Sequence, residues 1–295
     1  MRFCALVVPT LGLLLASAVH GEPLLFHEHG HGLSFSADGG ALIAPSERGL
    51  AIYEGGRWDE PAGDSGGFSG FSASERALYS SGHAQAGHRA RGLIRSTDGG
   101  RTWRALALEG EADFPMVAAG YRTGVVYVLS AKPNSAMPVP GIHVTFDEGK
   151  SWQRADTRGL KGEIHGLAAH PSDAGVVAAA TGSGLYLSRD AGQSFRRLDG
   201  RGPATALAFD LDGKRVRYAR ALSGELVESA LDGRQRRSLR LPQLEGDYVT
   251  CLAQNPKVGQ ALAFATRRRE VYVTSDGGRS WRRLSAEEKQ SRESE

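Results

Sequence analysis

One short segment of this sequence occurs four times, and its repetition limits the folds that are open to the chain. Each copy has an aspartate, a glycine two residues later and an aromatic residue three residues after that glycine; the aspartates are Asp98, Asp147, Asp190 and Asp276. They lie 49, 43 and 86 residues apart. A fixed period of about 40 to 50 residues is typical of propellers and solenoids, in which each repeat is one structural unit.

Two incomplete copies extend this period. Because 86 is twice 43, a degenerate copy is expected midway between the last two aspartates, where Asp232 and Gly233 occur without an aromatic residue. An earlier incomplete copy covers residues 54–58 and ends in Trp58. All four tryptophans of the protein therefore occupy the same position of the repeat. We conclude that the chain contains six units.

The residue types of the repeat predict a tight turn between the third and fourth strands of a sheet. The aspartate carboxylate can accept hydrogen bonds from turn amides, and glycine permits the positive φ that the turn needs. The aromatic side chain is expected to pack under the next blade. This interpretation gives a structural and not a catalytic role to Asp98, Trp103, Asp147, Trp152, Asp190, Phe195, Asp276 and Trp281.

The composition and the apolar pattern favour an all-β protein. The chain has 295 residues, of which 39 are glycine, and it shows no long amphipathic helical pattern. We predict a six-bladed β-propeller of four-stranded antiparallel blades within residues 22–285, with a seven-bladed ring as the alternative. The blades are expected at about residues 31–60, 67–108, 113–156, 163–199, 204–240 and 247–285.

Both ends of the chain are expected to lie outside the propeller. Residues 1–21 combine a basic start, an apolar run and small residues near Ala18 and Gly21, as export signals do. The run is shorter than the roughly 20 residues that span a bilayer, so no membrane span is expected. The polar segment 286–295 is expected to be a disordered tail. The mature protein is therefore predicted to be periplasmic or secreted, with cleavage between residues 18 and 21.

Charge and cysteine content argue against a nucleic-acid partner and against an internal disulfide. The 36 basic and 33 acidic residues are scattered along the chain, which has a formal net charge of +3. A nucleic-acid-binding protein would have a concentrated basic face, so no nucleic acid is expected as a partner. Cys4 lies in the predicted signal, which leaves Cys251 without a partner for an internal disulfide. We expect a monomer.

The repeated segment resembles the Asp-box, or BNR repeat, of sialidases, sortilin-type receptors, photosystem II assembly factors and bacterial secreted propellers. Its pattern is Ser/Thr-x-Asp-x-Gly-x-Thr/Ser-Trp. A longer resemblance, to a family of bacterial exported Asp-box propellers often labelled glycosyl hydrolases, is carried by His31-Gly32-Leu33, by residues 79–83, 92–100 and 120–124, and by His165-Gly166-Leu167. This resemblance implies a propeller, and either a binding role or glycoside hydrolysis.

Histidines concentrate on the face of the ring opposite the repeated turns. His27, His29, His31, His83, His88, His143 and His165 are expected at this face or at the strand ends beside it, and only His170 maps to the other side. At one height around the axis, the inner strands are expected to present His31, Ser69, Pro115, His165, Thr205 and Thr250.

One hypothesis for this face is a transition-metal site. Imidazole and carboxylate groups suit Zn²⁺ or Cu²⁺, and the candidate ligands are His29, His31, His83 and His165. Alternate residues on an extended strand are about 6.6 Å apart, so a straight strand cannot supply all the ligands of one ion. The alternative is that these histidines hydrogen-bond the blade ends in a solvated channel.

A second hypothesis is glycoside hydrolysis of the sialidase type. It needs three arginines for a substrate carboxylate, a Tyr/Glu nucleophilic pair and an acid. The catalytic candidates are Tyr248, Glu163 and Asp113, and the candidates for an anionic ligand are Arg89, Arg91, Arg220 and Arg267, with Arg268 and Arg269 beside the last. The Arg-Ile-Pro motif of sialidases is missing near the start of the predicted mature chain, which counts against this chemistry.

The third hypothesis is that the open face holds a peptide, a glycan or a partner protein. Propellers of the sortilin and photosystem-assembly kind act in this way, and such a role requires no set of reacting groups. We therefore predict ligand binding or assembly through the histidine-rich face, with metal binding as a possible addition. A sialidase-like glycosyl hydrolase is the alternative.

Overall fold

The structure is a computed structural model that describes residues 32–46, 49–59, 67–83, 89–221 and 223–284. The predicted export signal at residues 1–21 and the predicted tail at residues 286–295 lie outside the described residues. Within the described ranges the regular elements are the strands β1 to β24. No helix in this part of the chain is long and apolar enough to cross a membrane.

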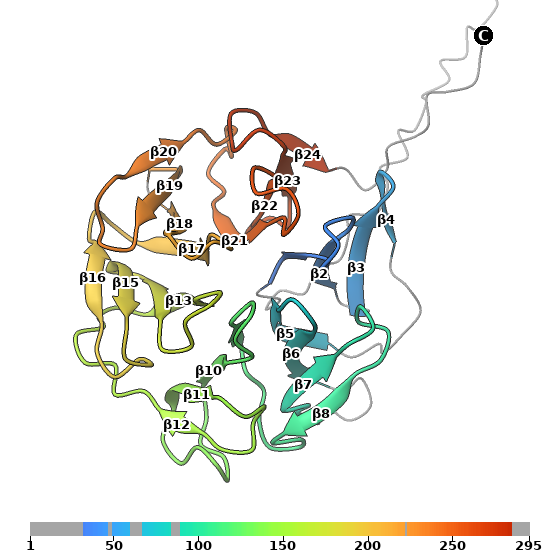
Figure 1. The fold of residues 1–295 in the computed structure, drawn as a ribbon, viewed down its shortest axis with the longest axis vertical. Helices are drawn as coiled ribbons and strands as arrows, with labels where there is room; N and C mark the ends of the chain where they lie inside the picture. Colours follow the sequence, from blue (N-terminus) through green and yellow to red (C-terminus); the bar gives the residue numbers. More distant parts are fainter. Residues whose placement is uncertain (1–31, 47–48, 60–66, 84–88, 222, 285–295) are drawn as a thin grey trace, which may run out of the picture.

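The strands form six four-stranded antiparallel sheets in a ring, so the predicted six-bladed β-propeller is confirmed (Figure 1). Each blade is built from four consecutive strands, and the innermost strands lie beside one another around the axis. Blades 1 to 3 comprise β1 (Ser34–Phe35), β2 (Leu42–Ser46), β3 (Gly49–Glu54) and β4 (Arg57–Asp59); β5 (Gly67–Ala73), β6 (Leu78–His83), β7 (Leu93–Ser96) and β8 (Arg104–Ala107); and β9 (Met116–Ala119), β10 (Val126–Ser130), β11 (Gly141–Thr145) and β12 (Gln153–Arg154). Blades 4 to 6 comprise β13 (Ile164–Ala169), β14 (Val177–Thr181), β15 (Gly184–Ser188) and β16 (Arg196–Asp199); β17 (Ala204–Phe209), β18 (Arg215–Arg220), β19 (Glu225–Ala230) and β20 (Arg237–Leu239); and β21 (Val249–Gln254), β22 (Leu262–Thr266), β23 (Val271–Thr274) and β24 (Arg282–Leu284).

The hydrophobic core is divided among the junctions between neighbouring blades. Leu187 of blade 4 packs in one cluster with Val216 of blade 5, and Ala44 of blade 1 packs in another with Val271 of blade 6. A blade inside the ring has a neighbour on both of its faces, so both faces must be apolar. This explains why β14 is buried along its whole length.

The aromatic residue of each repeat packs against the preceding blade, so the prediction that it lies under the next blade is wrong. Trp103 of blade 2 joins a cluster with Ile43 and Leu50 of blade 1. The indole N–H of Trp281, in blade 6, donates to the carbonyl of Arg240, which follows blade 5, at 2.8 Å. The turn places the aromatic residue just before the outermost strand, where its side chain covers the junction with the blade before it.

The four complete turns share one hydrogen-bond pattern. One carboxylate oxygen of Asp98 accepts the Thr102 amide at 3.0 Å, and the other accepts the Thr102 hydroxyl at 2.5 Å. The Ser96 hydroxyl donates to Asp98 and accepts the amide of Gly100, whose φ is 91°. The same contacts recur at Asp147, Asp190 and Asp276. These carboxylates are therefore engaged within their own turns, as predicted.

Blade 5 has an arginine in place of the aromatic anchor, and it has ion pairs within its sheet. Arg236 stands where the complete turns have their aromatic residue, and it donates to the carbonyl of Leu198 in blade 4. The next residue, Arg237, donates to Glu228 at 2.9 Å. Glu228 also accepts from Arg217 at 2.8 Å, and Arg217 pairs in turn with Asp210. The Glu228 side chain is 5% exposed and that of Arg217 is 10% exposed. The sheet of this blade is thus held partly by buried charges.

Hydrogen bonds between the connections of first and second strands link the blades on the side of the repeated turns, here called the Asp-turn face. Blades 3 and 4 are joined by the Arg122 N–H and the Pro171 carbonyl (2.7 Å), and blades 4 and 5 by the His170 ring and the Gly213 carbonyl (2.8 Å). Blades 5 and 6 are joined by the Leu211 N–H and the Gln254 side chain (2.8 Å), and blades 6 and 1 by the Asn255 side chain and the Gly39 carbonyl (2.8 Å). The ring is closed by side-chain and backbone contacts between sheets, because each sheet in the described part of the chain contains strands of one blade.

Candidate functional site

The loop face, opposite the Asp-turn face, carries the connections between second and third strands and between successive blades. Near this face, the innermost strands of four blades contain an irregular register with the second strand, and the displaced residues include Ser69, His165, Thr205 and Thr250. These are four of the residues that the sequence predicted at one height around the axis. A β-bulge redirects a side chain, so each of these residues leaves the regular alternation of its strand.

Two of the bulge side chains reach the following blade. Nδ1 of His165 lies 2.9 Å from the carbonyl oxygen of Ala204, the first residue of β17. The Thr205 hydroxyl donates to the carbonyl of Val249, the first residue of β21, at 2.7 Å. Bulge side chains thus fix the points at which the chain enters the next innermost strand.

A polar cluster on the loop face, here called the Asp113 cluster, consists of Ser69, His83 and Asp113. Oδ2 of Asp113 accepts the Ser69 hydroxyl at 3.1 Å and lies 3.1 Å from Nε2 of His83. Oδ1 of Asp113 is buried and has no hydrogen-bond partner among the described residues. The His83 side chain is 44% exposed. The carboxylate orients the imidazole through Nε2, and Nδ1 has no hydrogen-bond partner among the residues that the structure describes.

The candidate metal ligands do not converge in the described part of the chain. His29 and His31, like His27 and His88, lie outside the described residues. His83 is in blade 2 and His165 in blade 4, and each is bonded to the protein through one ring nitrogen. No group of three or more His, Cys, Asp or Glu side chains that could hold a metal ion occurs among the residues that the structure describes.

His143 does not contribute to the loop face. It lies within β11, its residue is 2% exposed, and Nδ1 is 3.2 Å from the Gly141 carbonyl. Burial lowers the pKa of its imidazole, which favours the neutral form. The prediction that placed it at the loop face or at the strand ends beside it is therefore wrong, because it lies in the middle of β11 and is buried.

Arg220 is not available to an anionic ligand, contrary to the prediction. Its guanidinium contacts Asp199 at 2.5 Å and Glu225 at 2.6 Å, and its side chain is 9% exposed. The Tyr218 hydroxyl also donates to Asp199, at 2.6 Å. Arg220 therefore joins β16 and β18 through a buried carboxylate.

The remaining arginine candidates lie on separate blades. Arg89 and Arg91 belong to the β6–β7 connection of blade 2, where the Arg91 guanidinium lies 5.1 Å from the Phe68 ring centroid. Arg267 is exposed in the β22–β23 connection of blade 6, and its amide donates to the Tyr248 carbonyl at 3.0 Å. These side chains do not form the three-arginine clamp of a sialidase.

The catalytic candidates are also spread around the ring. Tyr248 precedes β21 of blade 6, Glu163 precedes β13 of blade 4 and is exposed, and Asp113 precedes β9 of blade 3. Asp113 is already bonded to Ser69 and His83. The structure therefore brings together Asp113, a candidate for glycoside hydrolysis, and His83, a candidate for metal binding, which were not predicted to pair.

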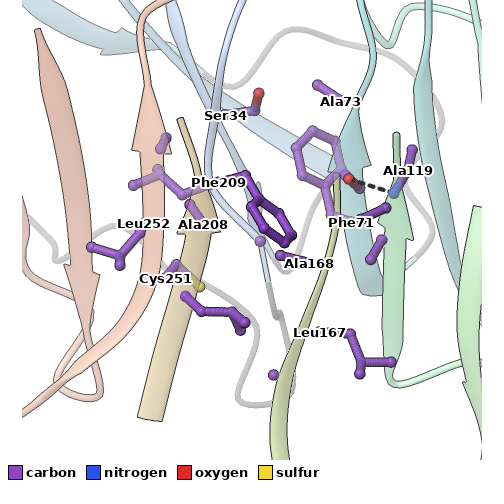
Figure 2. Close-up of a pocket in the computed structure, with 18 of the residues that line it drawn as sticks. Ser34, Phe71, Ala73, Ala119, Leu167, Ala168, Ala208, Phe209, Cys251 and Leu252 are labelled. Carbon is purple, nitrogen blue, oxygen red and sulfur yellow. Dashed lines mark hydrogen bonds between the residues drawn. The ribbon is translucent and has the colours of Figure 1, made fainter. Parts of the chain in front are cut away.

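A cavity of about 180 Å³ lies on the axis of the ring (Figure 2). Its wall extends from His165 and Thr250, at the bulges, to Tyr121 and Pro171 near the Asp-turn face. All six innermost strands contribute, through Ser34 of β1, Phe71 and Ala73 of β5, Ala119 of β9, Leu167 and Ala168 of β13, Ala208 and Phe209 of β17, and Cys251 and Leu252 of β21. No Asp, Glu, Lys or Arg occurs among the described lining residues.

The backbone of the innermost strands supplies the polar groups of this cavity. Each of these strands pairs with one neighbour only, so the N–H and C=O groups of its other edge face the axis. Cys251 lies in the wall, and burial raises the pKa of its thiol to about 11, so the sulfur stays protonated. A solvated channel was expected on this axis, and His165 and Thr250, two of the residues predicted at one height around it, line the cavity.

Known structures resemble this one in fold. One is a GH74 enzyme of Niastella koreensis, with a TM-score of 0.59 and 14% identity over 90% of this chain and 47% of that chain. This chain and that enzyme therefore share a fold. A chain of a nidogen/laminin complex has a TM-score of 0.62 and 12% identity over 83% of this chain and 93% of that one. YCF48 bound to D1 peptide has a TM-score of 0.51 and 18% identity over 89% and 83%.

The comparisons reach no further than the fold. The sequence matches no protein-family model and no curated protein. The chain spans about half the length of the GH74 enzyme. At these levels of identity, the likeness supports a β-propeller and assigns no activity.

Proposed function

We propose that this propeller is an exported, monomeric binding or assembly protein that holds a peptide or protein segment on its loop face. The observation that carries the proposal is the Asp113 cluster, in which residues of two blades meet around one carboxylate. The imidazole of His83 is oriented there and half exposed. Such a group can accept a hydrogen bond from a peptide N–H, or donate one when it is protonated.

The axial cavity supports a binding role over glycoside hydrolysis. Its described wall has no carboxylate to protonate a leaving group and no arginine to hold a substrate carboxylate. It instead presents strand edges and small side chains, which suit an apolar or neutral segment of a partner. Two of the similar structures, YCF48 with D1 peptide and the nidogen/laminin complex, are of propellers with peptide or protein partners.

The test is a selection of random displayed peptides on the immobilised protein, followed by affinity measurement of the enriched sequences. We expect His83→Ala to weaken binding by about tenfold, the effect of losing one well-placed hydrogen bond. Lys150→Ala, on the Asp-turn face, is the matched control and should bind as the wild type does. Enriched peptides that bind both variants equally well, or no enrichment at all, would refute the loop face as the site.

The competing activity is tested on the same protein. A panel of chromogenic glycosides and sialosides should give no product with the wild type. Product release that is abolished by Asp113→Asn or Tyr248→Phe would instead support the glycoside hydrolase.

A further inference from the structure

The incomplete repeat of blade 5 has a different surface from those of the other blades. Its turn and the start of β20 contain Arg234, Arg236 and Arg237, and Arg196 of β16 lies beside them across the junction with blade 4; all four are exposed. We call this set the blade 5 arginine patch. The position that holds an aromatic residue in the complete repeats, directly before the outermost strand, is occupied here by Arg236.

The guanidinium groups of the patch are held mainly by uncharged acceptors. The two terminal nitrogens of the Arg196 guanidinium lie 3.4 Å from the carbonyl oxygen of Leu231 and 3.5 Å from that of Asp232. The Arg236 guanidinium donates to the carbonyl of Leu198. A carbonyl oxygen orients a guanidinium group without neutralising its charge. The side chains are thereby ordered before a ligand arrives, which lowers the entropic cost of binding.

Few carboxylates oppose these charges. Glu228 pairs with Arg237, but its side chain is 5% exposed and it is shared with Arg217. Asp232 is the exposed carboxylate within the turn, and its Oδ1 accepts the amide of Arg234 at 2.8 Å. The side chain of Arg234 itself has no protein partner among the described residues. The patch therefore has a net positive charge.

We infer that the blade 5 arginine patch binds an acidic polysaccharide, a linear polymer with carboxylate or sulfate groups along its length. Guanidinium groups pair with such anions through two parallel hydrogen bonds. The patch lies on the outer edge of two neighbouring blades, where a flexible chain can follow β16 and β20 (Figure 1). This surface is separate from the loop-face site.

Two other polyanions fit the patch less well. The exposed large apolar side chains of the described residues are Val139, Phe146 and Val258, which lie in blades 3 and 6, so the patch has none to insert into a membrane. A single-stranded nucleic acid would use aromatic side chains for base stacking, and the patch has arginine where the repeat has its aromatic residue. The polysaccharide is the polymer whose recognition needs only the charges and donors present.

The test measures binding of the full protein to polygalacturonate and to heparin at increasing NaCl concentration. We expect saturable binding that weakens with salt, and about tenfold weaker binding for the variant Arg196→Gln, Arg234→Gln, Arg236→Gln, because three exposed ion pairs are lost. The matched control removes three exposed arginines elsewhere, by Arg76→Gln, Arg104→Gln and Arg154→Gln. It should keep the wild-type affinity within about twofold, since exposed charges far from the ligand are screened by salt.

The single variant Arg234→Gln tests whether weaker binding could result from a loss of folding. Because this side chain has no partner in the described structure, the variant should unfold at the wild-type temperature and still bind about twofold to threefold less tightly. Equal losses in the two triple variants would overturn the inference, since net charge alone would then explain binding. Absence of binding to both polymers, or tighter patch-dependent binding to phosphatidylglycerol vesicles or single-stranded DNA, would also overturn it.

Discussion

Nδ2 of Asn255 donates a hydrogen bond to the carbonyl oxygen of Gly39 at 2.8 Å, and this contact joins the last blade of the ring to the first. Oδ1 of the same side chain accepts the amides of Lys257 and Val258 at 2.9 and 3.1 Å. One side chain, 7% exposed as a residue, thus orders its own turn and connects two sheets that are distant in the sequence.

Asn255→Ala should lower the free energy of unfolding by about 1–3 kcal/mol, because it removes the hydrogen bond across the seam between blades 6 and 1 and two bonds to the amides of the adjoining turn. Urea denaturation of the full protein measures this. Asn134→Ala is the control, since Asn134 bonds only within the β10–β11 connection of blade 3. A smaller loss for Asn255→Ala than for Asn134→Ala would show that the closing contact does not stabilise the ring.

The turn aspartates should make the protein sensitive to acid. Hydrogen bonds from the hydroxyls of Ser151 and Ser194 lower the pKa of Asp147 and Asp190 to about 2. A carboxyl whose pKa is lower in the folded state stabilises the fold above its unfolded value near 3.8, and this contribution is lost as the pH falls to about 2. Urea midpoints measured between pH 5 and 2 should therefore fall steeply for the wild type and less for Asp147→Asn. Asp156→Asn serves as control, because Asp156 makes only a 3.9 Å ion pair, with Arg158.

Asp210 should give the opposite dependence on pH. Burial raises the pKa of its carboxyl to about 6, although Arg217 acts against the shift. The folded state then holds the proton more tightly than the unfolded state, so this group contributes stability at low pH that is lost as the pH rises from about 4 to about 6. Asp210→Asn should remove that loss while Arg217 keeps its contact with Glu228. Thermal unfolding of both proteins at pH 4, 5, 6 and 7 tests this, and parallel curves would contradict it.

His83 and His165 are not expected to share a zinc ion. Asp113 holds Nε2 of His83, the Ala204 carbonyl holds Nδ1 of His165, and the two histidines lie in different blades. Isothermal titration of metal-free protein with Zn²⁺ and Cu²⁺ should therefore give the same result for the wild type and for His83→Ala. A one-to-one site that disappears in His83→Ala would contradict this expectation and support the metal hypothesis.

The repeat allowed the fold to be predicted because its signals are local. In blade 4, the segment 163–199 that was expected around Asp190 and Phe195 contains β13 through β16. The turn contacts of Asp190 are likewise made within a few residues. A ring of six blades then follows from the number of repeats.

The site was predicted only in part, because its contacts depend on how distant blades meet. The sequence singled out Asp113 and His83, but 30 residues separate them and nothing in the pattern indicated their pairing. Arg220 was expected to be free because its carboxylate partner Asp199 lies in another blade. The bulges were missed because a single extra residue does not disturb the apolar pattern of a strand that is buried on both faces.

Each blade is one uninterrupted stretch of chain, and the seam at Asn255 and Gly39 is held by non-covalent contacts like those at the other junctions. The position of the chain ends is therefore not required by the pairing of the strands. A circular permutant that joins blade 6 to blade 1 by a linker and begins at the connection before blade 4 would contain the same six sheets. In such a protein the present seam would become an ordinary covalent junction, and a new one would open between blades 3 and 4.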